Sequence, residues 1–155
     1  MWSFDDAVVG STIHHPGGRT IGVDEHVWLA WVTNNASDLH GNADAAAHMQ
    51  FGRTVVVGVL TVAIVIGLAE PAEWPAQELA RHRPTGWRSI RLLGPAFAGD
   101  TLRAESLILD ARRLDDTCGV VRREVVGWTQ AGIEVVRVDE ERVVTTRERG
   151  RTKDC

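Results

Sequence analysis

The residues best suited to chemistry lie together in one polar segment, Thr33–Asp44, with the sequence TNNASDLHGNAD. His40 can accept and release a proton near neutral pH. Asn35 can hold a water molecule through its amide but cannot take up a proton. Asp38 has two possible roles: it orients the imidazole of His40 from the same side of an extended segment, or it turns the loop through an Asx hydrogen bond. The composition predicts a loop, where Asn35 and His40 can converge, because on a helix they would point about 140° apart.

A long uncharged run, Thr54–Ala69, follows this polar segment. It is shorter than the roughly 20 apolar residues that span a bilayer. As one strand it would extend about 53 Å and as one helix about 24 Å, whereas a domain of this length has a radius of gyration near 15 Å. We therefore predict a helix that is apolar on all sides and surrounded by protein. A break at Gly58 is the alternative, and it would give two shorter elements.

Segments rich in Val, Ile and Leu with interleaved charges predict strands after a proline-containing loop over 70–86. The short connections between them favour antiparallel hairpins. Upstream we expect a short strand, Arg19–Val23, and a helix capped by Asp24 that ends near Val32 and carries Trp28 and Trp31 as core or pocket-wall residues. The class is α+β, with an antiparallel sheet of about five strands around a central buried helix. The later strands are predicted at Trp87–Leu93, Thr101–Arg113, Gly119–Thr129 and Ile133–Thr145.

Composition limits the classes of partner and location. The chain has 155 residues, 44% of them hydrophobic, which predicts one globular domain. A formal net charge of −4 gives no electrostatic drive towards nucleic acid, and the Arg-rich C-terminal tail is interleaved with acids, as in a frayed, solvated end. Neither Cys118 nor Cys155 belongs to a closely spaced ligand set, and the histidines lack ligand spacing, so no metal site is predicted. Without a secretory or membrane-spanning pattern, we expect a cytoplasmic protein.

Two segments carry a resemblance to a known family. Thr33–His40 is similar to the signature Thr-Gly-Asp-x-Asn-Pro-x-His of the MaoC-like dehydratases and R-specific enoyl-CoA hydratases, and Phe51–Gly58 resembles their later Phe-Gly-x-x-Ile-x-His-Gly. Leu92–Leu102 and Trp128–Gly132 are similar to two further family segments. The resemblance spans about residues 18–145. It implies a single hot-dog domain over 1–155, with its core at about 18–146 and both termini frayed.

The resemblance also implies an activity: a hydro-lyase that adds or removes water across the α,β double bond of an acyl thioester. His40 matches the catalytic histidine, and the backbone N–H of Gly58 matches the donor to the thioester oxygen. Asn35 stands where the family has its catalytic Asp, and Val57 where it has a second His. Gly58 also has a simpler interpretation, that it lets the helix pack close to a neighbour.

The implied partners are an acyl-thioester substrate and a second copy of the chain in a homodimer. No cofactor is expected, because coenzyme A or phosphopantetheine enters only as part of the substrate. Two alternatives remain: a hot-dog thioesterase, and a non-catalytic acyl-thioester-binding subunit. The apolar run lacks the acid that hot-dog thioesterases often carry on the central helix, which favours a hydratase over a thioesterase. Asn35 in place of Asp favours the binding subunit.

Overall fold

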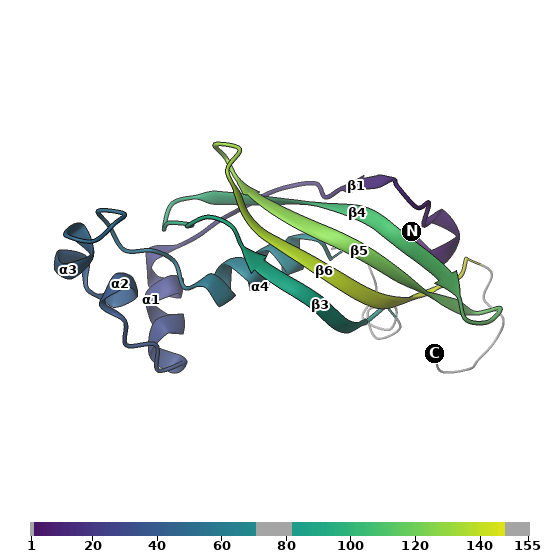
Figure 1. Cartoon of the computed structure of the whole chain (residues 1–155), viewed down its shortest axis with the longest axis horizontal. Helices are drawn as coiled ribbons and strands as arrows, with labels where there is room; N and C mark the ends of the chain where they lie inside the picture. Colours follow the sequence, from purple (N-terminus) through teal and green to yellow (C-terminus); the bar gives the residue numbers. More distant parts are fainter. Residues whose placement is uncertain (1, 71–81, 148–155) are drawn as a thin grey trace.

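The computed structural model describes residues 2–70 and 82–147. In these ranges an antiparallel six-stranded sheet packs against one long helix, and three shorter helices lie together beyond one end of the sheet (Figure 1). The predicted α+β class is confirmed. Most of the predicted loop over 70–86, and the tail after Arg147, lie outside the described residues. The helices are η1 (a 3-10 helix, Phe4–Asp6), α1 (Val23–Val32), α2 (Asp38–Gly41), α3 (Ala43–Ala47) and α4 (Gly58–Leu68).

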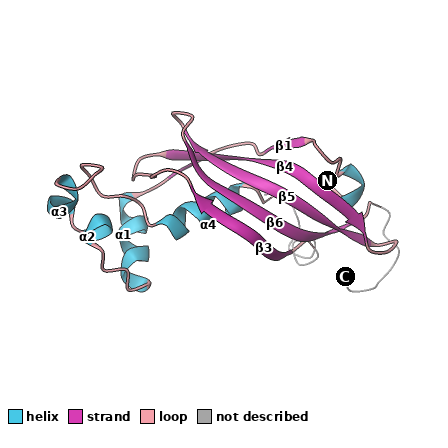
Figure 2. Cartoon of the chain, in the orientation of Figure 1, coloured by secondary structure: helices cyan, strands magenta, loops and turns pink. Residues whose placement is uncertain are grey.

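The sheet is built mainly from three long strands that follow one another in the chain (Figure 2). Their strand order is β1-β4-β5-β6-β3, and β2 also pairs with β4. The predicted bounds of β4, β5 and β6 agree with the structure to within one residue at each end. The short strand β1 was not predicted, because three residues are too few to show an alternating pattern. The strands are β1 (Thr12–His14), β2 (Arg19–Thr20), β3 (Pro84–Leu92), β4 (Thr101–Arg113), β5 (Cys118–Thr129) and β6 (Glu134–Thr145).

Helix α4 lies against the face of the sheet formed by β4, β5 and β6. Its Ile64 and Val65 are buried among valines of β5 and β6, so the predicted central helix is confirmed. It begins at Gly58, and residues 54–57 precede it as a non-helical segment. The expectation that protein surrounds the helix on all sides is wrong for one chain, since Val59 is 60% exposed.

Helix α1 has the reverse of the expected orientation. Its buried residues are His26 and Ala30, whereas Trp28 and Trp31 are 63% and 76% exposed, so the prediction that the tryptophans are core residues is wrong for the isolated chain. The expected cap is also displaced. The helix begins at Val23, and its start is closed by Glu25, whose carboxylate accepts the N–H of Gly22 at 2.7 Å. The predicted strand Arg19–Val23 is accordingly limited to β2.

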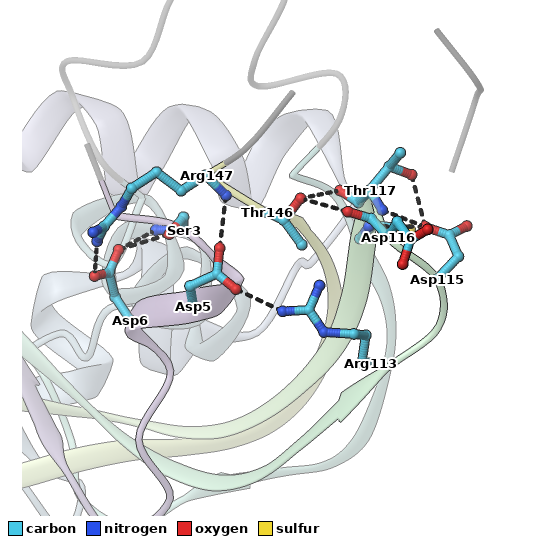
Figure 3. Close-up of polar contacts among 10 residues, drawn as sticks. Ser3, Asp5, Asp6, Arg113, Asp115, Asp116, Thr117, Thr146 and Arg147 are labelled. Carbon is cyan, nitrogen blue, oxygen red and sulfur yellow. Dashed lines mark hydrogen bonds and ion pairs between the residues drawn. The ribbon is translucent and has the colours of Figure 1, made fainter. Parts of the chain in front are cut away.

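The start of the chain is packed rather than frayed, which differs from the sequence expectation. Phe4 packs in a second apolar cluster with residues of β4, β5 and β6. Figure 3 shows the polar contacts that hold this end beside the end of β6. Asp5 accepts the backbone N–H of Arg147 at 2.8 Å and pairs with Arg113 at 2.6 Å, and Asp6 pairs with the Arg147 side chain. These exposed ion pairs orient the first turn more than they stabilise it.

The side chain of His15 lies partly buried, with Nε2 2.8 Å from the hydroxyl oxygen of Ser106 on β4. Burial lowers the pKa of His15 from its ordinary 6.5 to about 4, and Arg123 opposes its protonation further. Below pH 6.5 the unfolded chain therefore binds a proton that the folded chain does not accept until about pH 4. A depressed histidine pKa contributes stability that is complete above 6.5 and is lost as the pH falls.

We predict that His15→Gln removes part of the acid sensitivity of folding. Between pH 6.5 and 4 the wild type should lose stability faster than the variant, by up to about 1.4 kcal/mol per pH unit, because one proton is linked. Urea unfolding across this range measures the difference. His48→Gln, at an exposed position directly after α3, is the matched control. Parallel pH curves for the wild type and His15→Gln would refute the linkage.

Candidate active site

The predicted polar loop contains two short helices, which is a correction of its expected conformation. Asp38–Gly41 forms α2 and Ala43–Ala47 forms α3. Because Asp38 and His40 lie on a helical turn, their side chains point in directions about 160° apart. The expectation that they share one side of an extended segment is therefore wrong. Four-residue helices such as α2 give no hydrophobic period from which a sequence can predict them.

His40 is fixed by one hydrogen bond. Its Nδ1 lies 2.7 Å from the carbonyl oxygen of Val55, and Val55 in turn donates its N–H to the carbonyl of Leu39 at 3.0 Å. A carbonyl oxygen only accepts, so Nδ1 carries the proton and donates it. In the neutral imidazole, Nε2 is then left with a lone pair that can accept a proton. His40 is half-buried, which combines a fixed orientation with access to a ligand.

Asn35 and Asp38 do not contact His40 through any hydrogen bond recorded in the described residues. The Asn35 side-chain oxygen lies 3.5 Å from the backbone nitrogen of Ser37, a marginal Asx-type contact. Asp38 accepts a hydrogen bond from the Asn42 amide at 3.3 Å and is exposed. Asp38 thus neither orients the imidazole nor forms the expected Asx turn.

The start of the loop requires an unusual backbone conformation at Asn34, whose φ is +54°. The family signature has glycine at this position, and asparagine is among the few other residues that adopt the left-handed region readily. Asn34 can therefore keep the backbone conformation that glycine has in the signature. It keeps Asn35 directly after the end of α1, where its N–H donates to the carbonyl of Ala30 at 2.8 Å.

Val57 and Gly58 form the start of α4. As the first helical residue, Gly58 has an N–H that the helix itself does not pair, and the helix dipole places partial positive charge there. A Cβ built on Gly58 would lie 2.5 Å from Leu92 Cδ1, so glycine also permits close packing against β3. Both interpretations of Gly58 thus have a geometric basis. Val57, which is 4% exposed, places an apolar side chain directly before it.

Other residues of the family-like segments have structural roles. Asn42 caps α3 by accepting the N–H of Ala45 at 3.1 Å. Gln130 accepts the N–H of Thr101 at 2.7 Å and donates to Asp100 at 3.0 Å. These contacts hold the β3–β4 connection beside the β5–β6 hairpin, and Val56 joins that connection by donating its N–H to the carbonyl of Ala96 at 2.9 Å.

Sequence analysis missed His26 as a neighbour of the candidate site. It is 1% exposed on the inner side of α1, and its Nδ1 has no hydrogen-bond partner among the described residues. Burial lowers the pKa of His26, and the charge of nearby His40 lowers it further. The two histidines therefore lie close enough to interact. The sequence did not indicate this pair of histidines, because Trp28 and Trp31 made the opposite face of α1 the expected buried face.

A buried group of charges at the other end of α4 was also missed. Arg123 donates to Glu140 at 2.8 Å and to the carbonyl of Ala69 at 3.0 Å, and it lies 3.3 Å from Glu70. Arg142 binds both oxygens of Glu70, at 2.8 and 2.9 Å. Burial lowers the pKa of Arg123, and Arg142 lowers it further. Glu70, the acid at the end of the apolar run, is thus already engaged by two guanidinium groups.

The described residues contain neither a metal-binding cluster nor a membrane-spanning helix. Within 2–70 and 82–147, no three His, Cys, Asp or Glu side chains gather closely enough to hold a metal ion. No helix in the same ranges combines the length and apolar character needed to cross a membrane.

Comparison with known proteins places this chain in a family. A model of the MaoC-like domain matches residues 6–129, and the chain belongs to this family. It is 32% identical over 114 residues to β-methylmalyl-CoA dehydratase of Chloroflexus aurantiacus, a match that covers 70% of this chain and 29% of that protein. The chain thus spans less than a third of the length of this relative.

Solved structures agree on the fold. The MaoC-like dehydratase of Rhodospirillum rubrum has a TM-score of 0.81 at 22% identity, and the match covers 96% of this chain and 100% of that one. The R-hydratase PhaJ1 of Pseudomonas aeruginosa has a TM-score of 0.71 at 23% identity, covering 94% and 86%. The hot-dog-like MaoC fold expected from the sequence is thereby confirmed.

Proposed function

We propose that this protein is a hydro-lyase that adds water to, or removes it from, the α,β double bond of an acyl-CoA thioester. The observation that carries the proposal is the bond from His40 Nδ1–H to the Val55 carbonyl, which leaves Nε2 as a proton acceptor. The family membership and the CoA-thioester dehydratase among its relatives support the same class of reaction.

In the hydration direction, His40 Nε2 takes a proton from water while the water oxygen bonds to the β-carbon. Electron density moves to the thioester oxygen, which accepts a hydrogen bond from the N–H of Gly58. The imidazolium of His40 then gives its proton to the α-carbon, so the elements of water are added in full. Asn35 holds the water through its amide but exchanges no proton. His40 is the base and acid in one residue.

The test is loss of the conjugated enoyl-thioester absorbance, measured with a panel of short enoyl-CoA substrates for the wild type and His40→Ala. Turnover that depends on His40 would support the proposal, whereas turnover unaffected by the substitution would refute the assigned site. Thioesterase activity is disfavoured because the acid at the end of α4, Glu70, is bound by Arg142 and Arg123.

A non-catalytic acyl-thioester-binding subunit is the second candidate. The observation that favours it is Asn35 itself, because the family position normally supplies a carboxylate that can take part in proton transfer. Asn35→Asp separates the two candidates. An enzyme should gain hydration rate when the carboxylate is restored, whereas a pure binder should gain none.

We also propose that two copies of the chain pair through β3. All nine residues of this edge strand are exposed. Ile90 and Leu92, 42% and 57% exposed, face the same side of the sheet as buried Val138 and Val136, their register partners. An open edge with uncovered apolar side chains is a surface that a second β3 can cover.

We predict that the wild type sediments as a dimer of the 17.0 kDa chain and that Ile90→Asp sediments as a monomer. A carboxylate placed on the paired edge would be desolvated in the dimer, which disfavours association. Leu114→Asp, at a 48% exposed position between β4 and β5, is the matched control and should stay dimeric. A monomeric wild type would contradict the proposal.

A further inference from the structure

Arg53 has an unusual environment for an exposed arginine. Its guanidinium carbon lies 3.6 Å from the centroid of the Phe97 ring, a cation–π contact that fixes the orientation of the group. Phe97 is braced in turn: Phe51 meets it edge-on, with the centroids 6.2 Å apart, and the Phe97 N–H donates to Asp100 at 2.9 Å. The guanidinium is therefore held in place without a hydrogen bond to an acid.

No carboxylate of the described residues lies within ion-pair distance of Arg53. The acid of the same connection, Asp100, has one oxygen on the Phe97 N–H and the other on the Gln130 amide. Stacking uses a face of the guanidinium and leaves its N–H groups free. Four other exposed arginines differ from Arg53, because each is paired with an acid: Arg19, Arg88, Arg113 and Arg147.

The backbone places this cation next to the candidate site. Gly52 has a φ of +66°, a conformation that glycine adopts without strain, and its N–H closes a turn onto the Met49 carbonyl at 3.1 Å. The chain then passes through Arg53 to Val55, the residue that fixes His40. Arg53 and Gly58 are five residues apart, so their Cα atoms lie within about 18 Å of each other.

We propose that Arg53 binds a phosphate of the coenzyme A part of the substrate, an inference that rests on the proposed acyl-CoA activity. A free, oriented guanidinium matches phosphate and carboxylate oxygens in the same way, through paired N–H donors. Arg53 is exposed, whereas the reacting acyl group has to be enclosed with His40 and Gly58. The phosphates of coenzyme A are separated from the thioester by the uncharged pantetheine arm. A coenzyme A phosphate is therefore a better ligand for the exposed Arg53 than a carboxylate on the enclosed acyl group would be.

The test measures binding of coenzyme A and of pantetheine, which lacks the phosphates, by calorimetry to the full chain. For Arg53→Gln we expect the Kd of coenzyme A to rise about ten-fold, the scale of one lost charge-assisted contact, and that of pantetheine to stay unchanged. Arg53→Lys, which keeps the charge but not the planar fork, should give a smaller rise. Arg112→Gln is the matched control, an exposed arginine at the opposite end of β4 with no acid partner among the described ion pairs.

The outcomes separate this proposal from the proposed function. No coenzyme A binding by the wild type, or the same Kd for the wild type and Arg53→Gln, would overturn the role of Arg53. A weakening seen only with pantetheine thioesters that carry an acyl carboxylate would assign Arg53 to the acyl group and overturn the phosphate. Hydration of crotonyl-pantetheine by the wild type tests the proposed activity separately, because that substrate has no anion for Arg53.

Discussion

Replacing His40 by alanine is expected to lower kcat for enoyl-CoA hydration by about 10²–10⁴-fold, the usual contribution of one general acid–base group. The physical reason is the tautomer fixed by the Val55 carbonyl, which leaves Nε2 as the proton acceptor in this loop. Asn35 cannot replace it, since an amide does not take up a proton. The measurement is the decay of enoyl-thioester absorbance at saturating substrate, so that kcat rather than KM is compared.

His40→Gln is the companion variant, because its amide can still donate to the Val55 carbonyl while it lacks a titratable nitrogen. Both variants should lose activity and keep the far-ultraviolet circular dichroism of the wild type. Asn35→Asp should act in the opposite direction and raise kcat. If His40→Gln turned over substrate at the wild-type rate, proton transfer by His40 would be excluded and the site would have to be sought elsewhere.

The sequence predicted the long elements well for a simple reason. In β4 the alternation of residues extends far enough to define a period, and the predicted bounds of β4 are those of the structure. Helix α4 has no such period, and the length of its uncharged run predicted it instead. Short elements lack that signal. The segment with α2 contains Asp38 and His40 on a turn of helix, and its polar composition is equally typical of a loop.

The resemblance predicts His40 and Gly58 as site residues because motifs mark their positions. The structure adds the hydrogen bonds and packing around them, which a motif does not contain. The hydrogen bond of His40 goes to Val55, an apolar residue whose side chain carries no functional signal. His26 was missed because α1 buries its histidine and exposes Trp28 and Trp31. The rule that apolar residues are buried therefore predicted the wrong side of α1.

Consecutive charges concealed the buried group beneath the sheet. In β5 the residues Arg122, Arg123 and Glu124 are all charged, so alternation does not say which one faces inward. The structure places Arg123 inside, 3% exposed, with Arg122 and Glu124 on the opposite face. The register pairs Arg123 with Glu140. The inner charge is therefore set by register, which short-range patterns do not specify.

Arg123→Met is expected to lower the free energy of unfolding by about 3–5 kcal/mol, the cost of leaving one charge of a buried pair without its partner. Glu140 is 0% exposed, and its Oε1 already has no hydrogen-bond partner among the described residues. Loss of the Arg123 guanidinium would remove the 2.8 Å bond to its other oxygen. Urea unfolding followed by circular dichroism measures the change, and Glu140→Met should cost a similar amount.

The double variant Arg123→Met/Glu140→Met decides whether the cost comes from an unpaired charge. With both charges removed, most of the stability should return, because apolar side chains of similar size can replace a buried pair. Arg122→Met is the control on the same strand. This substitution removes the ion pair between Arg122 and Asp139, in which the two charged atoms are 2.6 Å apart and the side chains are partly exposed. It should lower the free energy of unfolding by no more than about 1 kcal/mol. If the double variant lost the sum of the two single effects, volume and packing would govern this site, and charge pairing would not.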